Sequence, residues 1–167
     1  KTTAKGVKST LGRLSRGSVA LDKAYDGALQ RIKGQLVGHH ELAKKVLSWI
    51  TFAKRPLTTA EICSALAVEP GEAELDPENK PDAEDLVSVC AGLVVIDPES
   101  AVIHLVHYTT QEYCERILDE WNPRAQLDIT LTCLNYLCLD VFKGGASLTD
   151  RDFESRLEKN PLLDYAA

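Results

Sequence analysis

The chain has 167 residues, of which 44% are hydrophobic and 26% are charged. This length is enough for one domain with a buried core, and no apolar run approaches the roughly 20 residues that a membrane-spanning helix needs. The start of the sequence shows no signal-peptide pattern, so we expect an ordinary soluble globular protein without a membrane span.

The net charge of −6 is divided unevenly along the chain. Residues 1–40 contain eight Lys or Arg and two Asp, a net charge of +6, so the remaining residues carry −12. Residues 69–100 are densely acidic. Two interpretations stay open: a solvated basic tail with an acidic loop, or two segments that dock onto neighbours of opposite charge.

The five cysteines form no C-x-x-C pair and fall in or beside apolar helical stretches: Cys63, Cys90, Cys114, Cys133 and Cys138. A structural zinc site needs closer spacing. Because disulfides belong to oxidising compartments, we expect all five to be reduced core residues of an intracellular, cytoplasmic protein.

In chain order, a first helix is predicted at 20–33, where an apolar stripe ends at Gly34. A second helix is predicted at 40–53, before Lys54-Arg55-Pro56. Thr58 and Glu61 have the spacing of a capping box, which predicts a short helix at 59–67.

After an acidic loop, a helix is predicted at 81–91, with Pro81 at its first position. Residues 93–96 predict a strand, 97–100 a turn, and 101–107 the returning strand. Three helices followed by a β-hairpin predict a winged helix. The expected fold class is therefore mainly α: three helices plus a two-stranded β wing, flanked by additional α-helices.

The wing leads into more helices. Thr109 is the predicted N-cap of the next helix, with Glu112 as its capping-box partner, and Tyr108 and Tyr113 as an aromatic staple. The longest helix is predicted to begin at Asn122-Pro123 and end at 143–145. Its predicted apolar stripe consists of Leu127, Leu131, Leu134, Cys138 and Val141/Phe142.

Two further helices are predicted near the end of the sequence. Thr149 and Asp152 have the spacing that caps one of them, and Asn160-Pro161 begins the last.

DNA reading by the winged helix is not expected. Such domains place a helix in the major groove, where Lys and Arg must neutralise phosphates. The helix at 81–91 carries Asp82, Glu84 and Asp85 and no basic residue. Non-specific nucleic-acid binding through the basic residues 1–33 stays open.

No motif of a P-loop, a dinucleotide site, a serine hydrolase or a zinc protease is present. We interpret His39-His40 as a solvated helix start and His104 as a structural or surface residue. The sequence predicts neither a catalytic residue nor a metal ligand.

His107 lies where the second strand gives way to a helix. A helix N-terminus offers unpaired N–H groups and a positive dipole end, which attract phosphate. A histidine there adds a donor whose charge can follow the ligand. From the residues alone, His107 is either a phosphate sensor or a locally satisfied histidine.

The stretch LVHYTTQEY resembles the F-x-H-x-x-x-Q-E-F pattern of winged-helix domains in the NACHT family of signal-transduction ATPases, which are NLR-like STAND proteins. His107, Gln111 and Glu112 match the pattern, and Leu105 and Tyr113 replace its two Phe.

Other segments agree with this resemblance, which covers roughly residues 11–167. LSWITFAKRPLTTAEICSALAV is similar to the winged-helix start of fungal NACHT proteins with ankyrin or WD40 repeats, the type labelled GPI inositol-deacylase winged helix. LDKAYDGALQRIKGQ resembles the segment between the ATPase core and the winged helix. TCLNYLCLDVF and NPLLDYAA resemble the connector toward the repeats.

The resemblance implies that His107 contacts the β-phosphate of ADP and helps to hold a closed, inactive state. Thr109, Gln111 and Glu112 belong to the supporting helix N-terminus. It also implies three segments: the end of the NACHT module with a basic tail (1–36), the winged helix (37–120) and a helical connector toward C-terminal repeats (121–167).

Three hypotheses follow. In the first, the fragment is a non-catalytic regulator in a larger NTPase of innate-immunity type. The parent binds ADP or ATP with Mg²⁺, and the fragment contacts the NACHT core and the repeats and couples nucleotide state to homo-oligomerisation. In the second, it is a constitutive scaffold between an ATPase core and repeats, which predicts that His107 is buried. In the third, residues 1–33 bind nucleic acid without specificity.

Overall fold

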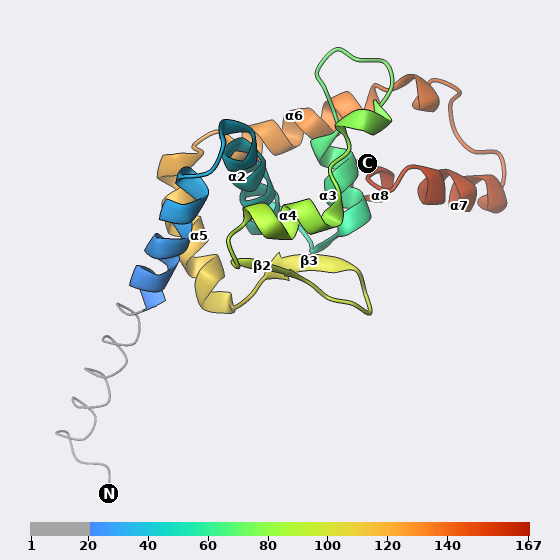
Figure 1. Ribbon diagram of the computed structural model, residues 1–167. Helices are drawn as coiled ribbons and strands as arrows, with labels where there is room; N and C mark the ends of the chain where they lie inside the picture. The colour runs from blue at the N-terminus through green and yellow to red at the C-terminus, as the bar shows by residue number, and fades with distance from the viewer. Residues whose placement is uncertain (1–20) are drawn as a thin grey trace, which may run out of the picture.

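The computed structural model describes residues 21–167 and is built mainly from helices (Figure 1). Residues 21–33 are helical. The longer helices that follow are α2 (Val37–Phe52), α3 (Thr59–Leu66), α4 (Ala83–Val89), α5 (Tyr108–Trp121), α6 (Ala125–Leu137), α7 (Asp150–Lys159) and α8 (Leu163–Ala166). Two 3-10 turns are η1 (Pro77–Asn79) and η2 (Asp140–Phe142). The basic tail over 1–20 lies outside the described residues.

A small antiparallel sheet consists of β1 (Leu57–Thr58), β2 (Val94–Ile96) and β3 (Val102–Leu105), in the order β1-β3-β2. On β3, Ile103 stands opposite Leu57 on one side and Ile96 on the other. The predicted hairpin is confirmed. The predicted two-stranded wing is incomplete, because β1 has only two residues and is too short to give a periodic signal.

The turn of the wing is held by Asp97. Its Oδ1 accepts hydrogen bonds from the backbone N–H groups of Ser100 and Glu99, at 2.8 and 2.9 Å. The bond from the Ser100 N–H, followed by those from the Ser100 hydroxyl and the Glu99 N–H, lowers the pKa of the Asp97 carboxyl. The carbonyl of Ala101 accepts from the N–H of Thr59 at 2.9 Å, which ties the hairpin to the start of α3.

Helix α2 lies at the centre of the molecule and contacts α3, α4, α5, α6 and β3 (Figure 1). One core cluster runs from Ile32 through Leu47 and Leu118 to Tyr136 and Leu162, all fully buried. The prediction of a mainly α winged helix with flanking helices is confirmed. All three predicted segments contribute side chains to this single core.

Two predicted caps are confirmed. Thr58 and Glu61 form a complete capping box on α3, in which the Glu61 N–H donates to the Thr58 hydroxyl and the Thr58 N–H donates to the Glu61 carboxylate. Thr149 caps α7 and accepts from the Asp152 N–H at 3.1 Å. In contrast, α4 begins at Ala83 with Asp82 as N-cap. The placement of Pro81 at its first position was therefore wrong.

The prediction of one long helix after Asn122-Pro123 was also wrong. Helix α6 has 13 residues and ends at Leu137, and η2 follows, so α2 with 16 residues is the longest described helix. The predicted stripe faces outward: Leu127, Leu131 and Leu134 are exposed at 50%, 42% and 55%. Helix α6 instead buries Ala125, Ile129 and Tyr136.

The cysteines divide into three environments. Cys63, Cys90 and Cys114 are buried, Cys133 is half-buried and Cys138 is exposed, and all five are free thiols. Burial raises the pKa of the Cys90 and Cys114 thiols to about 12. The expectation of a core position is therefore wrong for Cys138, which follows the last turn of α6 on its outer side.

Candidate anion-binding site

A cavity of about 350 Å³ opens where the end of α2, strands β1 and β3 and the start of α5 meet. Its volume lies within the range of roughly 300–1,000 Å³ that is typical of ligand pockets. The basic lining residues are Lys54, Arg55, His104 and His107. Among the described residues no Asp or Glu lines this cavity. Arg55 pairs with Glu61 and Asp164, so Lys54 is the lining Lys or Arg without an acidic partner among those residues. We call this cavity the α5 cavity.

His107 is the backbone N-cap of α5, with φ −147° and ψ 154°, and its carbonyl accepts from the Thr110 N–H at 3.0 Å. Within the described chain no side chain caps this helix. A 14-residue helix whose first turn carries no side-chain cap presents N–H groups and a positive dipole end to an anion. The imidazole of His107 is exposed and lines the same cavity.

The exposure of His107 is not the burial that the scaffold hypothesis predicts. Strand β3 ends at Leu105. The alternation that places Ile103 and Leu105 in the core therefore stops before it reaches residue 107.

The predicted capping of α5 by Thr109 and Glu112 is wrong. The helix begins at Tyr108, which places Thr109 inside the first turn. The Thr109 hydroxyl lies 2.7 Å from the hydroxyl of Tyr25 and so joins α5 to the helix over 21–33. Glu112 is exposed. Tyr108 is 78% exposed, so it forms no aromatic staple with the buried Tyr113.

Gln111 is part of the cavity wall. Its Nε2 donates to the carbonyl of Thr51 in α2 at 3.0 Å and to Glu115 Oε1 at 2.8 Å. This amide therefore fixes the first turns of α5 against the last turn of α2, and it lines the α5 cavity together with His107. Of the four residues predicted for the site, the structure brings His107 and Gln111 together at the cavity, while Thr109 and Glu112 do not line it.

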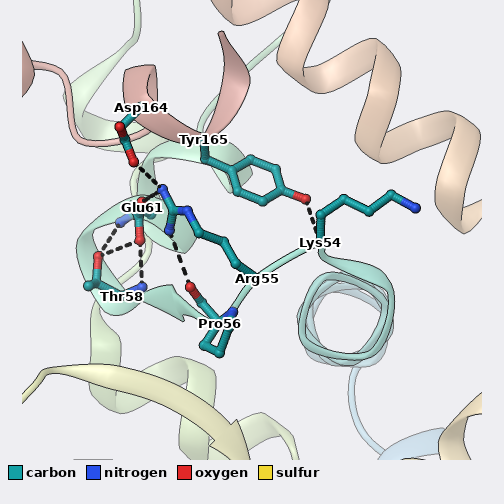
Figure 2. A network of polar contacts seen from close by, with 7 residues as sticks. All are labelled: Lys54, Arg55, Pro56, Thr58, Glu61, Asp164 and Tyr165. Atoms are coloured by element: carbon teal, nitrogen blue, oxygen red, sulfur yellow. Dashed lines mark hydrogen bonds and ion pairs between the residues drawn. The ribbon is translucent and has the colours of Figure 1, made fainter.

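Lys54 and Arg55 also line the cavity. From the sequence they were expected only to mark the end of a helix. Two consecutive basic residues before Pro56, at the end of an apolar helix, were the available signal. Nη2 of Arg55 donates to Glu61 Oε1 at 2.8 Å and to Asp164 Oδ2 at 2.7 Å, as Figure 2 shows. Its guanidinium is thus held at the cavity wall by two carboxylates from different parts of the chain.

Glu61 is the buried partner in this network, at 7% exposure. Its burial alone would raise the pKa of the carboxyl, but the hydrogen bonds from Arg55 and Thr58 outweigh that effect and lower the pKa. Glu61 therefore stays ionised and keeps Arg55 in place.

The histidine that the sequence left as a surface residue, His104, also lines the cavity. It is exposed, and its Nδ1 lies 2.9 Å from the carbonyl oxygen of Leu105. Across residues 21–167, no cluster of three or more His, Cys, Asp or Glu is placed to hold a metal ion. No helix in that range has the length and apolarity needed to cross a membrane.

The fold defines a winged-helix domain flanked by further helices. The profile of the family described as "GPI inositol-deacylase, winged helix domain" matches residues 29–127, and the chain belongs to that family. The match begins within the helix over 21–33 and ends in the first turn of α6.

A relative is "Azaphilone pigments biosynthesis cluster protein L" of Monascus ruber, which is 28% identical over 164 residues. The alignment covers 88% of this chain and 33% of the relative, so the chain spans about a third of that protein's length. No solved structure matches the chain.

Proposed function

We propose that this chain is the non-catalytic regulatory winged-helix segment of a NACHT-type signal-transduction NTPase. In the parent it packs against the ATPase core in the cytoplasm, and its α5 cavity receives the phosphates of bound ADP. The observation that carries the proposal is the position of His107, at the N-cap of α5 and on the rim of a cavity lined by basic residues and no acid among those described.

The chain's own groups can do this without catalysis. The first N–H groups of α5 and the imidazole of His107 serve as hydrogen-bond donors to the phosphate. Lys54 contributes a further positive charge to the rim. When ADP leaves, these contacts are lost, and the winged helix is then free to move away from the core and permit oligomerisation. A ligand shifts such an equilibrium only by contacts that differ between the two states.

The resemblance of LVHYTTQEY to the NACHT pattern supports the same reading, and it adds ADP or ATP with Mg²⁺ as the parent's cofactor. C-terminal ankyrin or WD40 repeats and a role in innate immunity follow from that resemblance alone. The relative's printed name places it in a pigment biosynthesis cluster.

The test is an ADP titration of the full-length protein, which includes the ATPase core. We expect His107→Ala to weaken ADP binding roughly 10- to 100-fold, because it removes a hydrogen bond to a charged group. His39→Ala is the matched control, since His39 is exposed at the start of α2 and does not line the cavity. Equal ADP affinity in wild type and His107→Ala would refute the proposal.

The scaffold alternative has one observation in its favour. Leu127, Leu131 and Leu134 form an exposed apolar row on α6, as expected of a protein-docking surface. In this alternative the chain joins an ATPase core to repeats whatever the nucleotide state. It predicts that ADP and ATP leave the exposure of α6 in the full-length protein unchanged.

Nucleic-acid binding through residues 1–33 remains a separate hypothesis, and most of that segment lies outside the described residues. Helix α4, which occupies the place of a recognition helix, carries Glu84 and Asp85 on its exposed side. Binding through the basic segment predicts an affinity for any duplex that falls steeply with salt and disappears when residues 1–20 are deleted.

A further inference from the structure

Helix α8 is seated on residues that also form the wall of the α5 cavity. The Tyr165 hydroxyl accepts the backbone N–H of Lys54 at 3.1 Å, and the Arg55 guanidinium lies 5.3 Å from the centre of the Tyr165 ring. Trp49 meets the same ring edge-on, with 5.7 Å between centroids. Trp49, Lys54 and Arg55 all line the α5 cavity. One short stretch at the end of α2 therefore serves both the cavity and the C-terminal helix.

Figure 2 shows how Asp164 and Tyr165 reach this stretch from α8, while Glu61 approaches Arg55 from α3. On the α8 side, Lys54 and Arg55 line a second cavity of about 580 Å³ together with Asp164 and Tyr165. The two basic residues thus form a partition, with the proposed phosphate site on one side and α8 on the other.

The two acidic partners of Arg55 are not equivalent. The Glu61 side chain is 9% exposed and also accepts from the Thr58 N–H at 2.7 Å and from the Thr58 hydroxyl at 3.0 Å. The Asp164 side chain is 68% exposed, and Arg55 is its one ion-pair partner among the described residues. An exposed ion pair contributes little to stability. If a bound anion competes for Arg55, the ion pair with Asp164 breaks before the one with Glu61.

We propose that an anion in the α5 cavity and helix α8 compete for the Lys54–Arg55 partition, so that phosphate binding loosens α8. This inference rests on the proposed function of the cavity as a phosphate site. It adds a coupling between two parts of the molecule: when an anion occupies the α5 cavity, helix α8 on the C-terminal side of the winged helix is released.

The electrostatics set the sign. A phosphate beside Arg55 attracts the guanidinium away from Asp164 and repels the Asp164 carboxylate, and both effects disfavour the docked helix. Because coupling between two sites is reciprocal, docked α8 must weaken anion binding by the same factor. Leu162, fully buried in the core, limits the released segment to the residues after it. The movable element is therefore α8 itself, Leu163–Ala166.

The test uses the 167-residue chain and inorganic pyrophosphate as the probe. Asp164→Asn removes the competing charge, and we expect pyrophosphate to bind about two- to five-fold more tightly, as the loss of an exposed ion pair allows. Glu154→Gln on α7 removes the same charge from an exposed position that contacts neither Arg55 nor the cavity, and its affinity should equal that of the wild type. Hydrogen exchange at 163–166 should quicken at saturating pyrophosphate in the wild type.

The outcomes separate the two proposals. If His107→Ala abolishes pyrophosphate binding but Asp164→Asn leaves the affinity unchanged, the competition is refuted and the phosphate site stands. If Asp164→Asn and Glu154→Gln tighten binding equally, only net charge acts and the competition is again refuted. If pyrophosphate binding is absent or does not depend on His107, the phosphate site itself fails, and the competition fails with it.

Discussion

Glu61 illustrates how a local sequence signal can be correct and still incomplete. Its spacing from Thr58 predicts the capping box, and the structure contains it. The same carboxylate also pairs with Arg55, six residues earlier and across the start of α3. This second role depends on how the chain turns at Pro56, for which no local pattern exists.

Replacing Glu61 by Gln is expected to destabilise the protein in a pH-dependent way. The folded protein holds the pKa of Glu61 below its ordinary value. The carboxylate therefore stabilises the fold above the ordinary pKa near 4.3, and this contribution is lost as the pH falls through the lower, folded pKa. We expect Glu61→Gln to lose about 1–2 kcal/mol at pH 7, and the difference from wild type to shrink below about pH 4.

Urea denaturation at several pH values measures this effect. Glu69→Gln is the control, because Glu69 is exposed and forms no ion pair within the described residues. A constant difference between wild type and Glu61→Gln from pH 7 to pH 3 would mean that the charge of Glu61 contributes nothing, and that the loss comes from replacing one of its hydrogen-bond acceptors by a donor.

At the start of α5 the sequence predicted Thr109 as the N-cap, because Thr is a good side-chain cap in general. The N-cap is nevertheless His107, and the Thr109 hydroxyl instead pairs with the hydroxyl of Tyr25 in the helix over 21–33. That partner lies 84 residues away. A contact between residues so far apart in sequence could not be predicted from the local pattern.

Among the elements, α6 shows most clearly where periodicity fails. Its sequence has two apolar faces, one with Leu127, Leu131 and Leu134, the other with Ile129 and Tyr136. The larger row was expected to face the core, but the structure buries the other one. Hydrophobic spacing alone cannot choose between two apolar faces, since the choice depends on which face α2 and α8 contact.

This orientation of α6 predicts that two substitutions on the same helix reduce the free energy of unfolding by unequal amounts. Ile129, 8% exposed, is expected to lose about 2–4 kcal/mol of unfolding free energy on replacement by Ala, because burial is lost and a cavity remains. Leu131, 42% exposed, is expected to lose less than about 1 kcal/mol on the same replacement. Chemical denaturation of the two single variants provides the comparison. Equal costs, or a larger cost for Leu131, would contradict the observed orientation of α6.

For the whole molecule, the sequence predicted the three helices, the hairpin and the winged-helix class, and these are confirmed, whereas β1 and the end of α6 were not predicted. It could not predict that the C-terminal helices return to the winged helix. Leu162 enters the core beside Tyr136, and Tyr165 reaches Lys54 across 111 residues. Contacts between residues so far apart in the sequence produce no periodic pattern that could predict them. For the same reason Arg55, the centre of the candidate coupling, was not singled out from the sequence.

A single core implies a single unfolding transition, which Leu162→Ala tests. Leu162 is fully buried, so its truncation is expected to cost about 2–4 kcal/mol. Trp49 of α2 contacts the Tyr165 ring of α8. The comparison is therefore made in a Trp49→Phe background, in which Trp121 of α5 is the single tryptophan and reports the winged helix. We expect the fluorescence transition of Leu162→Ala to shift to lower urea and to coincide with its circular dichroism transition.

Leu148→Ala, at 95% exposure, serves as the control and should cost less than about 0.5 kcal/mol. A fluorescence midpoint unchanged by Leu162→Ala would instead mean that α8 unfolds independently. The contacts of α8 with the Lys54–Arg55 partition would then be too weak to compete with anion binding.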